Sequence, residues 1–137
     1  MMKRCLLLIL SLIFLLSICH AEDETTLSAA GYVLVTSGDE TRCFALPEEE
    51  AYSFTVKRTT ADGTEMSNTI TITPEGVYVS EADCDNQDCV DEGMVTLENK
   101  ETRVLGNAIL CLPHQLLVEL FTTEEMQELL DAQEGAQ

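Results

Sequence analysis

Short runs of β-branched and aromatic residues, separated by turn-forming residues, recur along the chain from residue 31 onward. Apolar and polar side chains alternate in the segment 52–56 and strictly so in 68–73, which is typical of strands with one buried face. Turn sequences such as Asp62-Gly63 and Pro74-Glu75-Gly76 stand between the runs. The pattern predicts six or seven short strands, at 32–36, 42–46, 52–56, 68–73, 77–80, 108–112 and 115–120.

The alternation also predicts which side chains form the core. In the fourth run, Ile70 and Ile72 fall on one face and Thr71 on the other, so we expect a buried isoleucine pair and an exposed threonine. Val118 and Leu120 alternate in the same way near the end of the last run. Short strands with frequent turns and no long helical pattern predict a mainly β fold, a small antiparallel barrel or sandwich formed by residues 31–120.

The periodicity changes after the last predicted strand, in residues 121–137. Thr122 followed three residues later by Glu125 is a capping-box pattern, which marks the start of a helix. A short C-terminal helix is therefore predicted, with its apolar side chains on one face. A helix of about ten residues is marginal alone in water, so we expect this face to pack on the β domain. The alternative is a helix that binds a groove of a partner protein. The apolar face comprises Met126, Leu129 and Leu130.

The N-terminus has the pattern of a secretory signal peptide in residues 1–21. Lys3 and Arg4 precede a mostly apolar stretch. This stretch is followed by Cys19-His20-Ala21, whose first and last residues are small, as at a signal-peptide cleavage site. We predict cleavage after Ala21, a flexible leader over 22–30, and an extracytoplasmic location, secreted or in the cell envelope. The open alternatives are an uncleaved anchor and a lipid-modified Cys19. Contact with a membrane is expected only if this segment is retained.

The charge of the chain is strongly acidic. It has 7 basic and 25 acidic side chains, for a net charge of −18. A surface this negative repels phosphate backbones, so nucleic-acid binding is not expected. The partner is instead expected to be an unidentified protein or envelope component.

Four of the six cysteines lie beyond the predicted signal peptide, and they carry the candidate chemistry. An even number of cysteines in a small exported domain favours disulfides, with three pairings possible. Alternatively, three of them and a histidine offer the ligand types of a tetrahedral zinc site. A redox-active pair is not expected, because the acidic residues around Cys84 and Cys89 disfavour the thiolate. The disulfide candidates are Cys43, Cys84, Cys89 and Cys111, and the zinc candidates are Cys84, Cys89, Cys111 and His114.

The sequence lacks the residue patterns of other common catalytic and ion-binding sites. The chain has no catalytic serine or metalloprotease motif, and His114 beside a proline turn is expected to be structural. The acidic loop around Asp85 has carboxylates that could bind calcium. It departs from the EF-hand pattern of calcium-binding loops, because Asp88 occupies the position of the required glycine. No enzyme activity and no cofactor are therefore expected, and the loop is interpreted as a solvated acidic segment.

Two segments resemble a known family. The first, EADCDNQDCVDEGMV, contains Cys84 and Cys89, with four residues between them, and then Gly93. The second, GNAILCLPHQLLVEL, places Cys111 before a proline turn and an aliphatic strand. Over residues 31–120 the chain resembles the NusG domain II family of small exported bacterial proteins. The resemblance implies a compact, barrel-like β domain, homologous to a module inserted in some NusG transcription factors. It implies no transcriptional role and no established activity.

The resemblance also bears on the cysteine pairing. The family pattern couples the strand that carries Cys111 to the loop that carries Cys84 and Cys89, so we expect Cys111 to form a disulfide with one of them. A direct Cys84–Cys89 bridge is the alternative. Cys43 lies outside the matched motif and is expected to be unpaired.

Overall fold

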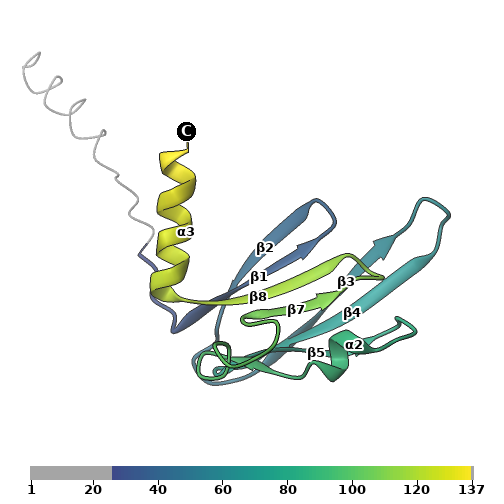
Figure 1. The fold of residues 1–137 in the computed structure, drawn as a ribbon, viewed down its shortest axis with the longest axis horizontal. Helices are drawn as coiled ribbons and strands as arrows, with labels where there is room; N and C mark the ends of the chain where they lie inside the picture. The colour runs from purple at the N-terminus through teal and green to yellow at the C-terminus, as the bar shows by residue number, and fades with distance from the viewer. Residues whose placement is uncertain (1–25, 137) are drawn as a thin grey trace, which may run out of the picture.

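The computed structural model describes residues 26–136, which form two four-stranded antiparallel sheets (Figure 1). The first sheet has the order β2-β1-β8-β7 and the second the order β3-β4-β5-β6. The first consists of β1 (Gly31–Ser37), β2 (Glu40–Ala45), β7 (Ala108–Cys111) and β8 (Leu116–Thr122). The second consists of β3 (Tyr52–Thr59), β4 (Glu65–Ile72), β5 (Gly76–Ala82) and β6 (Val95–Thr96). The mainly β fold predicted from the sequence is confirmed.

Two helices, α2 (Asp88–Asp91) and α3 (Thr123–Gly135), accompany the sheets. Every predicted strand is present, whereas β6 and α2 were not predicted. None of the helices in residues 26–136 is long and apolar enough to cross a membrane. The predicted signal segment, 1–21, lies outside the described residues. The described part of the leader, from residue 26, is held by hydrogen bonds, because Tyr32 Oη and the Thr123 hydroxyl bind backbone atoms of residues 28 and 29.

The core lies between the two sheets and is made by alternate residues of the central strands. Ile70 and Ile72 in β4 and Val118 and Leu120 in β8 are fully buried, as the alternation predicts. Strand β1 lies beside β8 and adds Val33 at the register position opposite Leu120. Burial of such side chains is the main favourable term for a domain of this size.

Thr71 corrects one part of the predicted register. It was expected to be exposed, but only 7% of its surface is accessible. Strand β4 lies between β3 and β5, so even a side chain that faces away from the core is flanked on both sides. The hydroxyl compensates for this burial with hydrogen bonds, because its oxygen is 2.7 Å from Ser53 Oγ and 3.0 Å from Ser80 Oγ. The buried threonine is therefore fully satisfied.

Helix α3 begins as predicted but packs less completely than expected. Thr122 and Glu125 form a reciprocal capping box at its start. Met126 is buried at 4% exposure, whereas Leu129 further along is 37% exposed. Figure 1 shows the helix rising away from the end of β8, so its later turns leave the sheets behind. The predicted packing face is thus confirmed for the first turn of the helix and is wrong for Leu129.

Candidate metal centre

Three cysteine sulfurs converge where the segment after β5 of the second sheet meets the end of β7 of the first sheet. Cys84 follows β5, Cys89 lies in α2, and Cys111 is the last residue of β7. The three Sγ atoms all lie within 4.8 Å of one another, and the Cys84 and Cys89 sulfurs are 3.8 Å apart. Two of the side chains thus come from one short segment after β5, and the third comes from β7, more than twenty residues later in the sequence.

The acidic loop folds over β7 because a glutamine organises its backbone. Gln87 adopts a left-handed conformation, with φ of 55°, immediately before the single turn of α2. Its Nε2 atom donates to the carbonyl oxygens of Ala82 and Cys84, at 2.8 and 2.6 Å. Gly93, with φ of 71°, ends the turn, a conformation that favours glycine. These two special conformations reverse the chain and bring Cys89 back onto Cys84.

The thiols of the cluster are shielded from solvent. Cys84 is 5% exposed, and Cys89 and Cys111 are each 1% exposed. Burial raises the pKa of the Cys89 thiol, and the neighbouring sulfurs of Cys111 and Cys84 raise it further. A buried thiol with a raised pKa is a poor nucleophile, because the thiolate is the reactive form. The cluster therefore lacks the electropositive, accessible setting of a redox-active cysteine.

The predicted disulfides are not formed in this structure. All four cysteines of the described residues are free thiols, and the 3.8 Å between the sulfurs of Cys84 and Cys89 exceeds the bonding distance of about 2.05 Å. The expected bridge from Cys111 to Cys84 or Cys89 is therefore absent, although the three side chains are brought together. Cys43 is exposed on β2 and takes no part in the cluster.

His114 does not join the cysteines, which corrects its inclusion in the candidate zinc set. Both of its ring nitrogens are engaged elsewhere, with Nδ1 2.6 Å from Asn68 Oδ1 and Nε2 3.2 Å from Asp83 Oδ1. The ring is buried at 5% exposure. Asn68 in turn donates from Nδ2 to Cys89 Sγ at 3.7 Å. His114 therefore reaches the cluster only indirectly, because its partner Asn68 is the residue that contacts a cysteine sulfur.

The acidic side chains of the loop do not converge on a cation site. The Asp83 carboxylate accepts hydrogen bonds from the backbone and hydroxyl of Ser67, and the backbone bond contributes most to lowering the pKa of Asp83. Asp88 accepts from the Asn86 side chain at 2.8 Å and is exposed. Among the described residues, the three cysteines are the one group placed to hold a metal ion.

Asn68 and Gln87 are site residues that the sequence reasoning missed. Gln87 Nε2 lies 3.9 Å from Cys84 Sγ, so two amide side chains approach two of the three sulfurs. One signal was available for Asn68. It lies two residues before Ile70 and therefore on the same, core-facing side of the strand as Ile70 and Ile72. A polar residue on an otherwise apolar face is typical of a buried polar contact. No sequence pattern indicates the position of Gln87.

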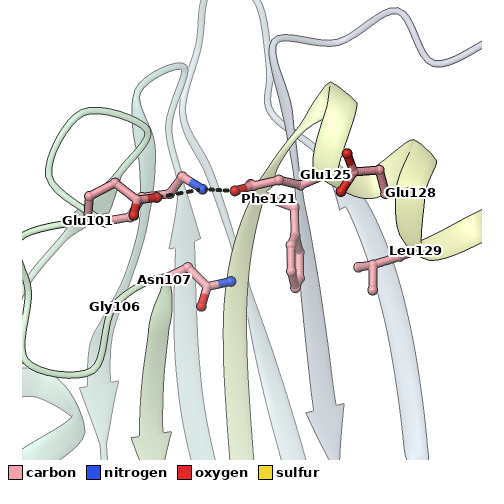
Figure 2. A pocket seen from close by; sticks show the side chains of 8 residues that line it. Glu101, Gly106, Asn107, Phe121, Glu125, Glu128 and Leu129 are labelled. Atoms are coloured by element: carbon pink, nitrogen blue, oxygen red, sulfur yellow. Dashed lines mark hydrogen bonds and ion pairs between the residues drawn. The ribbon is translucent and has the colours of Figure 1, made fainter.

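A cleft of about 420 Å³, separate from the cysteine cluster, lies at the base of α3 (Figure 2). Lys100, which is 6% exposed, forms an ion pair with Glu125 inside it, and Glu101 Oε1 lies 3.4 Å from the ammonium nitrogen. Burial alone would lower the pKa of Lys100, but the hydrogen bond and charge of Glu125 raise it. Burial would likewise raise the pKa of Glu125, and the contact with Lys100 lowers it. The pair fastens the start of α3 to the 100–107 loop.

This ion pair predicts an acid-sensitive attachment of α3. Because the pKa of folded Glu125 lies below its ordinary value of 4.5, its stabilising contribution is fully present above that value and is lost as the pH falls through the lowered pKa. Glu125→Gln should cost about 1–2 kcal/mol at neutral pH, less than a fully buried pair, because the Glu125 side chain is 39% exposed. The free energy of unfolding of this variant should also fall less steeply than that of the wild type as the pH is lowered. Denaturant unfolding between pH 3 and 7, about the range that spans glutamate titration, measures this acid limb of the stability curve.

Glu101→Gln is the matched control for this prediction. Its carboxylate also contacts Lys100 Nζ, but its side chain is 79% exposed. The substitution should therefore change stability little at any pH. If both variants retained the wild-type acid limb, the Lys100–Glu125 pair would not be what fastens α3.

The fold and the cysteine cluster together define a small two-sheet β domain with a buried thiol site. The sequence pattern of the NusG domain II family matches residues 5–124, so the chain belongs to this family. Among curated proteins, no relative matches it.

Two solved structures are similar in fold. The Lin0431 protein from Listeria innocua is 22% identical, with a TM-score of 0.55, over 68% of this chain and 97% of that one. A DUF1312 family protein from Enterococcus faecalis V583 is 21% identical, with a TM-score of 0.51, over 68% of this chain and 98% of that one. At these identities the likeness establishes the fold, and the function of the family is uncharacterised.

Proposed function

We propose that this chain is an exported, non-catalytic binding domain that holds a thiophilic metal ion on Cys84, Cys89 and Cys111. The observation that carries the proposal is the convergence of three buried sulfurs, two from the loop and helix after β5 and one from β7. A cysteine that served only to fill the core would need no other sulfur beside it. Thiolate sulfur is the ligand type preferred by soft and borderline metals such as copper(I) and zinc.

The spacing of the sulfurs supports this proposal. A metal–sulfur bond of about 2.3 Å places two sulfurs on one ion about 3.8 Å apart in a tetrahedral arrangement and about 4.0 Å apart in a trigonal one. The sulfurs of Cys84 and Cys89 are 3.8 Å apart, and all three sulfurs lie within 4.8 Å of one another. The Cys84–Cys89 pair therefore has the spacing that a bound ion requires, and Cys111 lies within reach of the same ion.

The chemistry around the cluster supports binding rather than catalysis. The thiols are buried, and the pKa of Cys89 is raised, so no reactive thiolate is presented to solvent. His114 has both ring nitrogens engaged by Asn68 and Asp83, which leaves neither free as a general base. Export is supported by the signal-like pattern of residues 1–21.

A disulfide within the cluster is the second candidate, favoured by the closeness of Cys84 and Cys89. Their sulfurs are already near each other, and an oxidising compartment would promote the bond. One bridge among three cysteines leaves a single thiol, so it would remove the metal site. The two candidates therefore predict different masses for the intact protein: two hydrogens fewer for a disulfide, and an added metal for the binding site.

Cys111→Ala is the variant that tests the proposed function. We expect the wild-type protein to take up one equivalent of Cd²⁺, Zn²⁺ or Cu⁺ in native mass spectrometry under anaerobic conditions. Loss of one of three sulfur ligands should reduce the affinity by more than the roughly 10–100-fold that follows loss of a supporting residue. Cys43→Ser is the matched control, because Cys43 is exposed and lies outside the cluster, and it should bind as the wild type does. Equal uptake by wild type and Cys111→Ala, or no uptake by the wild type, would contradict the proposal.

A further inference from the structure

The cluster supplies three metal ligands and no fourth. Within the described residues, no histidine or carboxylate joins the three sulfurs. His114 is held by Asn68 and Asp83, and the nearby Glu92 carboxylate accepts from the backbone nitrogen of Leu110 at 3.1 Å. The protein therefore fixes a coordination number of three unless solvent contributes a ligand.

Solvent has little access to the sulfurs. The most exposed of them belongs to Cys84, at 5%, and the other two cysteines are at 1%. Structural zinc sites take four protein ligands, and catalytic ones take three with a water in an open position. This site has neither a fourth side chain nor an open position. It matches instead a soft monovalent ion, which is stable with three thiolates in a plane.

One amide group is placed to stabilise negative charge on the sulfurs. Asn68 Nδ2 donates to Cys89 Sγ at 3.7 Å, whereas Gln87 Nε2 donates to two backbone carbonyl oxygens. Asn68 is only 3% exposed, and its N–H group points at a sulfur, which is a weak acceptor as a thiol and a much stronger one as a thiolate. The contact of its Oδ1 atom with His114 fixes the orientation of the amide, and Asp83 fixes the ring.

From these observations we infer that the ion bound at this site is Cu⁺, three-coordinate on Cys84, Cys89 and Cys111, with Asn68 donating an N–H group to the Cys89 thiolate. The inference rests on the proposed function and narrows it to one ion and its supporting residue. Binding replaces three thiol protons with one Cu⁺, so three protons are released, no electron is transferred, and the centre carries a net charge of −2. The Asn68 amide opposes this excess charge, as hydrogen bonds to metal-bound side chains do in other metal sites.

The test is a competition titration of the full mature protein against bicinchoninate, with Cu⁺ as the probe, under anaerobic conditions. A parallel titration uses Zn²⁺, and copper X-ray absorption reports the number of sulfur neighbours. We expect one Cu⁺ with three sulfur neighbours, bound in preference to Zn²⁺. If the protein binds Zn²⁺ or Cd²⁺ through the cysteines but prefers them to Cu⁺, the inference fails and the proposed function stands. If it binds none of the ions, both fail.

Asn68→Asp tests the amide donor. It replaces the NH₂ group with an oxygen of similar size and keeps the acceptor that faces His114. The variant should bind Cu⁺ about 10-fold or more weakly and shift the thiolate-to-copper charge-transfer band to longer wavelength. Asn86→Asp, on the loop between Cys84 and Cys89, is the control for added charge. Its side chain bonds to Asp88 and not to a sulfur, so its band should remain in place.

A change of band position is not produced by a loss of fold stability, and far-UV circular dichroism checks each variant. If Asn68→Asp fails to fold, Asn68→Leu, which removes the donor without adding charge, decides. An unshifted band with wild-type affinity in a folded Asn68 variant would overturn the assignment of the donor.

Discussion

Replacing Ile72 with alanine is expected to lower the free energy of unfolding by about 2–5 kcal/mol. Ile72 has no accessible surface and lies at the end of β4, an inner strand of its sheet. Alanine removes three buried carbon atoms and leaves a cavity that the two antiparallel sheets on either side cannot fully close. Urea denaturation, monitored by circular dichroism, measures the change. An unaltered dependence of the free energy of unfolding on urea concentration would show that the unfolded state is unaffected.

Thr71→Ala is the matched comparison, one residue away on the opposite face. Its hydroxyl bonds to Ser53 and Ser80, so the substitution removes two hydrogen bonds but leaves both partners at the partly accessible face of the sheet. We expect a loss of about 1 kcal/mol, clearly less than for Ile72. Equal losses at the two positions would mean that the inside–outside register of β4 is wrong.

The strands were predictable because they are governed by local rules. Alternation in β3 and β4, and turn residues such as Asp62-Gly63, act over a few residues and can be read directly from the sequence. Strand β6 escaped prediction because its two residues are too few to show a period. Helix α2 escaped for the same reason, since a single turn has no apolar periodicity. The burial of Thr71 depends on the neighbours of β4, which only the sheet order reveals.

The candidate site was predictable as to its cysteines but not as to its supporting residues. Cys84, Cys89 and Cys111 stand in the segments that carry the family resemblance, and the structure brings all three together. His114 was placed among them from its nearness in sequence to Cys111, but the proline turn directs its ring to Asn68. The Asn68–Cys89 contact joins β4 to α2 across 21 positions. Such a long-range pair follows from the fold as a whole, and no local pattern encodes it.

Gly76→Ala is expected to destabilise the domain by about 3 kcal/mol or more, at the upper end of the cost of overpacking. A Cβ atom at this position would lie 1.9 Å from the carbonyl oxygen of Val95 and 2.8 Å from its carbonyl carbon. Both atoms belong to the backbone of β6, which pairs with β5 at this point, so neither can rotate away as a side chain would. Relief of the clash requires β6 to separate from β5. Val95, which is fully buried, would then lose its place in the core.

The clash can be distinguished from a general effect of alanine by Gly135→Ala. Apart from the chain neighbours and the backbone of its own helix, nothing lies within 4 Å of a Cβ built on Gly135, the last residue of α3. Alanine also favours the helix by up to about 1 kcal/mol over glycine, so this variant should be neutral or slightly more stable. Thermal unfolding of the two variants side by side gives the contrast. A Gly76→Ala protein as stable as wild type would show that β6 does not approach β5 as closely as the Gly76–Thr96 pairing requires.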